Sequence, residues 1–156
     1  KGHGNVAFCP LSNLFLGSGL FNLGLSQTNH ILTGLGTDVG GGTSLSMLKV
    51  MGAAYNVTQL RKAFSDAPEN IQPLAPMENW YMATLGGARA LSLDHVIGSF
   101  TPGKEADFII LNPQSDNALK IRTESSDSVE SKIFAIEMMG DDRTVEHTYI
   151  MGRKLK

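Results

Sequence analysis

The sequence of 156 residues contains a single cysteine, Cys9. This excludes a disulfide framework and any zinc module built from several cysteines, and it favours a reducing, cytosolic compartment. Net charge is nearly absent as well, because 13 basic and 15 acidic side chains leave −2. No basic patch of the kind that binds a phosphate backbone is present, so nucleic acid is not an expected partner.

Charge is especially scarce in the first third of the chain, where Asp38 is the only charged residue between Gly2 and Leu48. Polar residues and glycines interrupt every apolar run there, well short of the roughly 20 residues that a membrane span needs. We therefore expect no membrane partner and predict that this stretch forms the interior of a folded domain. With 42% hydrophobic residues, the composition also excludes a disordered chain.

The pattern of apolar residues and turn residues predicts an α/β organisation. Buried strands are expected at 6–9 and 31–36, helices at 45–64 (capped by Thr43 or Ser44), 77–91 and 128–139, and strands at 106–111 and 145–151. A connector at 66–76, a turn-rich hairpin at 97–103 and a loop at 113–126 separate them. This order predicts an α/β layer at residues 1–93 and a small β-containing module at 94–156.

Asp38 is the main candidate for chemistry, since it follows a predicted buried strand and precedes a glycine-rich turn. Enzymes of the α/β class place catalytic residues at the carboxyl ends of such strands. A buried carboxylate is costly and needs a cation or strong donors beside it. Two interpretations stay open from the residues alone: a helix cap or Asx turn in the bend, or a metal ligand or general base.

The other chemistry-bearing residues form weaker patterns. Glycines after the second strand miss the dinucleotide-binding spacing by one residue, which disfavours a phosphate cradle. No histidine pair has metal-ligand spacing among His3, His30, His95 and His147. Cys9 has nothing basic near it in sequence and is predicted to be a packed thiol rather than a nucleophile.

Several segments resemble the carboxyl-terminal part of the metal-dependent amidohydrolases. They are Cys9 to Asn13, Gly34 to Ser44, Ala83 to Ala88 and Gly98 to Asp107. Within that superfamily, Gly36 to Met47 and Met139 to Arg143 are most similar to the guanine deaminases. The likeness runs from about Val6 to Lys154.

The resemblance implies a (β/α)8 barrel with a small β-sandwich, in which 6–9 and 31–36 are strands seven and eight. It implies that Asp38 binds a catalytic zinc ion and carries a proton from the metal-bound water to the leaving ammonia. Zinc lowers the pKa of bound water to about 7. The implied substrate is guanine, the product xanthine, and the full-length enzyme a homodimer.

The family's remaining metal ligands and its substrate-binding side chains have no counterpart in this sequence. A barrel needs about 250 residues, and the chain starts at Lys1 rather than Met, so we expect further sequence upstream. The hypothesis is an inactive portion of a guanine deaminase-like enzyme. The alternatives are another amidohydrolase acting on a different nitrogen heterocycle, or a non-catalytic scaffold or interaction module.

Overall fold

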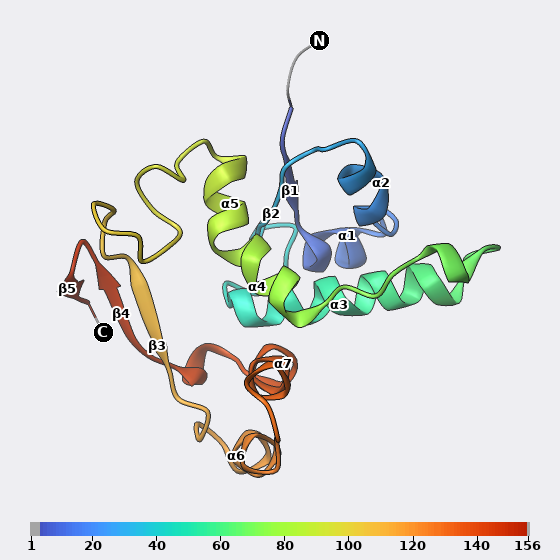
Figure 1. Ribbon diagram of the computed structural model, residues 1–156. Coiled ribbons are helices and arrows are strands. Elements are labelled where there is room, and N and C mark those ends of the chain that lie inside the picture. Colours follow the sequence, from blue (N-terminus) through green and yellow to red (C-terminus); the bar gives the residue numbers. More distant parts are fainter. Residues whose placement is uncertain (1–3, 156) are drawn as a thin grey trace.

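A pair of short parallel strands lies at the start of the chain in the computed structural model, which describes residues 4–155 (Figure 1). Strand β1 (Val6–Phe8) pairs with β2 (Thr33–Leu35), with Val6 opposite Thr33 and Phe8 opposite Leu35. Both predicted strands are confirmed with shorter bounds. Helices α1 (Pro10–Leu16) and α2 (Leu23–Thr28) connect them.

Helix α3 (Met47–Ala63) runs through the middle of the molecule and buries side chains on two sides. On one side Ala54 and Val57 pack in a cluster with Phe8, Leu23, Leu74 and Met82. On the other, Leu48 and Met51 pack against Leu119, Ala135 and Ile136. The predicted helix is confirmed, but its N-cap is Ser46 rather than Thr43 or Ser44.

The connector after α3 contains a short 3₁₀ turn, Pro68–Asn70. The single helix predicted over 77–91 is wrong, because the structure has two helices, α4 (Pro76–Ala83) and α5 (Leu85–Ala90). They part at Thr84, whose backbone torsions of −127° and −103° are not helical. After the break, α5 packs closely on β2. The apolar pattern of residues 77–91 is continuous and does not reveal this break.

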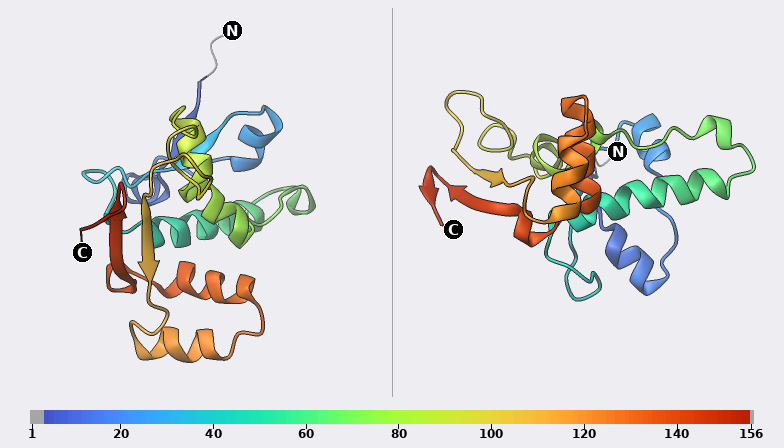
Figure 2. Two further views of the ribbon diagram at one scale, coloured as in Figure 1. Left: turned by 60° about the vertical axis from the view of Figure 1, so that its left-hand side comes forward. Right: turned by 90° about the horizontal axis from the view of Figure 1, so that it is seen from below.

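The last third combines an antiparallel sheet with two helices. Strands β3 (Phe108–Leu111), β4 (Val145–Ile150) and β5 (Arg153–Lys154) form the sheet in that order. Helices α6 (Asn117–Glu124) and α7 (Val129–Met139) lie together on one side of α3 (Figure 2), and the 3₁₀ turn Asp142–Thr144 leads into β4.

Two predictions for this part are wrong. The loop predicted at 113–126 contains α6, because Asp116 caps the helix by accepting the Leu119 amide (3.0 Å) and the Leu119 side chain is fully buried. The hairpin predicted at 97–103 consists of turns without a strand. The helix predicted at 128–139 and the strand at 145–151 are confirmed.

The prediction that the charge-poor stretch forms the interior of a folded domain is wrong for the described residues, because many of its large apolar side chains are exposed. Phe15 and Leu45 are 67% and 79% exposed. The other large apolar side chains exposed in this stretch are Leu14, Leu16, Leu25, Ile31, Leu32 and Val39. No segment within residues 4–155 covers them, so the low charge of this stretch does not reflect burial by the described part of the chain.

Close contact between β2 and α5 depends on Gly34. A Cβ atom at Gly34 would lie 2.8 Å from the Cα of Gly87, a backbone atom that cannot rotate away. We expect Gly34→Ala to lower the free energy of unfolding by about 1–3 kcal/mol, as overpacking in a core does. Urea unfolding of the chain, followed by the fluorescence of Trp80, its only tryptophan, measures this.

Gly4→Ala is the matched control, because a Cβ atom at Gly4 meets no heavy atom within 4 Å. Equal urea midpoints for the two variants would contradict the proposed contact.

No helix within residues 4–155 is both long and apolar enough to cross a membrane.

Candidate functional site

The candidate site lies where the two parallel strands end. Asp38 follows the last residue of β2 by three positions, and Ser12 lies in the first turn of α1, directly after β1. Because the carboxyl ends of parallel strands lie at the same edge of a sheet, the loops after β1 and β2 meet there. This is the edge at which α/β folds place their ligand and catalytic groups.

The side chain of Asp38 has one hydrogen-bond partner among the described residues. The Ser12 hydroxyl donates to Oδ2 of Asp38 at 2.7 Å. Ser12 is 3% exposed, whereas Asp38 is exposed. Hydrogen bonds to an ionised acceptor are shorter and stronger than bonds between neutral groups. The carboxylate is therefore held at one oxygen by a buried donor.

The backbone of Asp38 is also held. Its φ is 48°, in the left-handed region that non-glycine residues seldom adopt. Its carbonyl accepts hydrogen bonds from the amides of Gly41 (3.0 Å) and Gly42 (2.5 Å). The helix-cap interpretation of Asp38 is wrong, since Ser46 is the N-cap of α3 and the Asp38 side chain pairs with Ser12.

Gly41 provides the space in which Ser12 and Asp38 meet. A Cβ atom at Gly41 would lie 2.8 Å from Oγ of Ser12 and 3.3 Å from Oδ2 of Asp38. The absence of a side chain at Gly41 therefore leaves room for Ser12 and Asp38 to approach each other. Ser12 could not be identified from the sequence, because it lies inside the Cys9–Asn13 motif and no residue pattern there assigns it a role.

Cys9 lies close to the same strand ends. Burial raises the pKa of its thiol, and the negative charge of Asp38 raises it further. The thiol contacts the Ala7 carbonyl at 3.6 Å. A raised pKa disfavours the thiolate, which is the nucleophilic form. The prediction that Cys9 is not a nucleophile is consistent with this environment, although the residue is half-buried rather than fully packed.

The described residues do not form a metal site by themselves. No three His, Cys, Asp or Glu side chains within residues 4–155 come together in a group that could hold an ion. His30 and His95 are exposed, and His147 on β4 contacts Lys154. His3 lies outside the described residues. Since catalytic zinc takes about three protein ligands, Asp38 alone does not fit a complete zinc centre.

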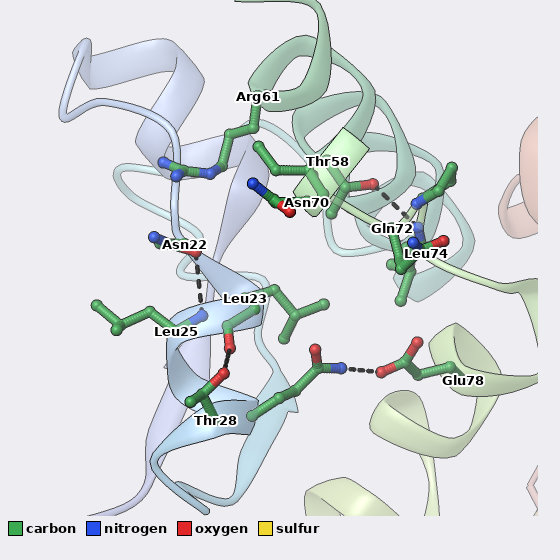
Figure 3. Close-up of a pocket in the computed structure, with 14 residues that line it drawn as sticks. Asn22, Leu23, Leu25, Thr28, Thr58, Arg61, Asn70, Gln72, Leu74 and Glu78 are labelled. Atoms are coloured by element: carbon green, nitrogen blue, oxygen red, sulfur yellow. Dashed lines mark hydrogen bonds between the residues drawn. The ribbon is translucent and has the colours of Figure 1, made fainter. Parts of the chain in front are cut away.

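A pocket of about 470 Å³ lies between α2, the end of α3 and the segment before α4 (Figure 3). In it the Gln27 amide donates to the Glu78 carboxylate, and burial raises the pKa of Glu78. Arg61 points its guanidinium to the Leu20 carbonyl at 3.0 Å. Neither Ser12 nor Asp38 lines this pocket, so it is separate from the candidate site.

Asp141 and Arg143 form a local charge pair. Their side chains are 2.7 Å apart, and hydrogen bonds from Arg143 lower the pKa of Asp141. Asp141 also caps the 3₁₀ turn before β4 in a capping box with Thr144. The segment thus has a structural role at the start of β4.

Comparison with known proteins assigns the chain to a family. The sequence model of the amidohydrolase family matches residues 1–155. The chain belongs to the amidohydrolase family. Guanine deaminase of Escherichia coli is 44% identical over 149 residues, which are 96% of this amidohydrolase chain and 32% of that protein.

Solved structures agree with this assignment. That of Escherichia coli guanine deaminase matches with a TM-score of 0.91 and 42% identity, over 99% of this chain and 34% of that one. An adenosine deaminase from Xanthomonas campestris, solved with bound zinc, matches with a TM-score of 0.74 and 28% identity, over 96% of this chain and 31% of that one. The amidohydrolase chain therefore spans about a third of the length of the relatives it matches.

Proposed function

We propose that this chain is the carboxyl-terminal portion of a longer amidohydrolase that hydrolyses guanine to xanthine and ammonia. The observation that carries the proposal is the 44% identity to a guanine deaminase over nearly the whole chain. Structural similarity to the same enzyme, with a TM-score of 0.91, supports it.

In this proposal β1 and β2 are strands seven and eight of a (β/α)8 barrel, and residues 94–156 contribute to a small β-sandwich. The parallel pairing of β1 with β2 supports their assignment as neighbouring barrel strands. The exposed apolar side chains near the strands, Phe15 and Leu45 among them, support contact with polypeptide outside this chain. The boundary near residue 93 is part of the proposal. Two helices, α6 and α7, interrupt the second segment and pack toward α3.

Asp38 supplies one carboxylate of the proposed catalytic site. Its position after a strand end and its fixation by Ser12 support this role. We assign the other zinc ligands and the guanine-binding side chains to polypeptide outside this chain. In the hydrolysis, water adds at C2 of guanine and ammonia leaves, and Asp38 accepts a proton from the water and returns it to the leaving nitrogen. We further propose that the full-length enzyme is a homodimer.

The proposal predicts different behaviour for the chain alone and for the longer polypeptide. We expect the 156-residue chain to bind no stoichiometric zinc and to form no xanthine, because residues 4–155 supply one candidate ligand of the roughly three required. The longer polypeptide is expected to bind zinc and convert guanine to xanthine. Elemental analysis of the purified proteins and chromatographic detection of xanthine measure both properties.

Xanthine formation by the isolated chain would refute the division of the site between this chain and the remaining polypeptide. A panel of purines, pyrimidines and triazines, assayed for ammonia release, tests the substrate. Activity of the longer polypeptide on another heterocycle but not on guanine would indicate a different amidohydrolase. Absence of any hydrolysis would favour a scaffold or interaction role.

A further inference from the structure

Ser12 is the one described side chain that hydrogen-bonds the Asp38 carboxylate, and it does so from a fixed position. It occupies the third residue of α1, a helix that begins at Pro10 immediately after Cys9 and β1. Proline at the first helical position favours the helix start, because its backbone torsion is already helical. The Ser12 side chain is 3% exposed. Its hydroxyl is therefore carried on the element that follows the neighbouring strand.

We propose that Ser12 is a positioning residue for Asp38, holding Oδ2 so that the other carboxylate oxygen is presented to the reacting groups. The kinetic part of this inference rests on the proposed function. The terminal torsion of an aspartate is broad and roughly two-fold, so a free carboxylate exchanges its two oxygens easily. A 2.7 Å hydrogen bond to one oxygen removes that freedom.

The surroundings of the pair favour positioning over a direct role for Ser12 in the reaction. The single hydroxyl proton of Ser12 is donated to Asp38, which leaves none for a substrate. Space for the contact is provided by Gly41, where a Cβ atom would come within 2.8 Å of Oγ of Ser12. The amides of Gly41 and Gly42 hold the backbone of the same aspartate. Asp38 is thus held at its carboxylate by Ser12 and at its backbone carbonyl by the turn.

The kinetic test compares Ser12→Ala, Ser12→Thr and the control Ser18→Ala in the longer polypeptide. Ser18 is exposed, and its side chain forms no hydrogen bond within residues 4–155. We expect Ser12→Ala to lower kcat about 10- to 100-fold, the usual effect of losing a partner of a site ligand. KM should change little, since the Ser12 hydroxyl donates its proton to Asp38 rather than to a substrate. Ser12→Thr keeps the hydroxyl and should restore most of kcat, and Ser18→Ala should match the wild type.

Equal loss of kcat in the alanine and threonine variants, or an unchanged kcat in Ser12→Ala, would overturn the proposal. A rise in KM that accounts for the whole loss would also overturn it, because it would indicate a substrate contact.

A second measurement does not depend on the reaction. Hydrogen exchange of the Gly41 and Gly42 amides reports the turn that holds Asp38. We expect about tenfold faster exchange in Ser12→Ala than in wild type or Ser12→Thr, with the rest of the protein unchanged. Unchanged exchange would overturn the proposal, because a carboxylate that Ser12 fixes should also restrain the turn that carries it. If the wild type does not hydrolyse guanine, the proposed function fails, and this measurement alone decides the role of Ser12.

Discussion

Replacing Asp38 with asparagine in the longer polypeptide is expected to lower kcat for guanine hydrolysis by about 10²- to 10⁴-fold, the range that a positioned proton-transfer group contributes. Asparagine has nearly the same shape, and its side-chain oxygen can still accept the hydrogen bond that Ser12 donates to Oδ2 in the wild type. It lacks the negative charge and cannot take up a proton from water at neutral pH. Steady-state kinetics of xanthine formation measure the loss.

Asp66→Asn is the matched control, because Asp66 is an exposed carboxylate in the connector after α3 and its side chain forms no hydrogen bond or ion pair within residues 4–155. It should leave kcat and the thermal midpoint unchanged. Retained activity in Asp38→Asn would refute the role assigned to Asp38. A loss of folding in that variant, seen as a lower thermal midpoint, would instead indicate that Asp38 mainly stabilises the turn.

A second large effect is expected from a buried carboxyl group in the helical part of the molecule. Glu137 on α7 is 1% exposed and accepts a hydrogen bond from the amide of Asn79 on α4 at 2.7 Å. The same amide donates to the Met51 carbonyl on α3 at 2.8 Å. Among the described residues, Oε2 of Glu137 has no partner. Burial therefore raises the pKa of Glu137 to about 7, although the Asn79 bond acts against the shift.

This raised pKa predicts that the protein loses stability as the pH rises. Between the ordinary value of 4.5 and about 7, the folded state holds a proton on Glu137 that the unfolded state has released. The stabilising contribution is complete below pH 4.5 and is lost as the pH rises through about 7. Glutamine cannot ionise, so the Glu137→Gln variant should not lose this contribution. We expect the difference in free energy of unfolding, variant minus wild type, to increase by about 3 kcal/mol from pH 4 to pH 8.

Urea unfolding of the chain at several pH values, followed by Trp80 fluorescence, measures this difference. Trp80 is half-buried and packs against the core cluster of α3, α6 and α7. Glu130→Gln, an exposed position on the same helix, is the control and should follow the wild type at every pH. If the gap between Glu137→Gln and wild type stays constant with pH, Glu137 does not titrate in the way proposed.

Much of the local structure could be predicted from the sequence, because local residue patterns determine it. The apolar runs before Pro10 and around Gly34 predict the two parallel strands, and the residue pattern at 128–139 predicts α7. The errors occur where distant contacts decide. Helix α6 is polar over most of its surface, and its one fully buried side chain, Leu119, finds its partners on α3 and α7.

In the candidate site, too, one residue could be predicted from the sequence and its partner could not. Asp38 could be identified from the sequence because it is the only charge in a long neutral stretch and follows a strand. Its partner could not, since Ser12 is 26 residues away and hydroxyl side chains are common in every kind of segment. Glu137 is one of several glutamates, and nothing near it in the sequence indicates burial against Asn79.

The sequence by itself therefore determined the scarcity of cysteine and net charge, the isolated position of Asp38 among uncharged residues, and the family motifs. Composition and short spacing are local properties of the chain. Tertiary structure alone decided that Ser12 holds Asp38, that Gly41 leaves room for the contact and that Glu137 is buried. Each of these depends on the approach of segments far apart in the chain. The exposed apolar side chains beside the candidate site were also visible only after folding, since exposure depends on which segments cover a side chain.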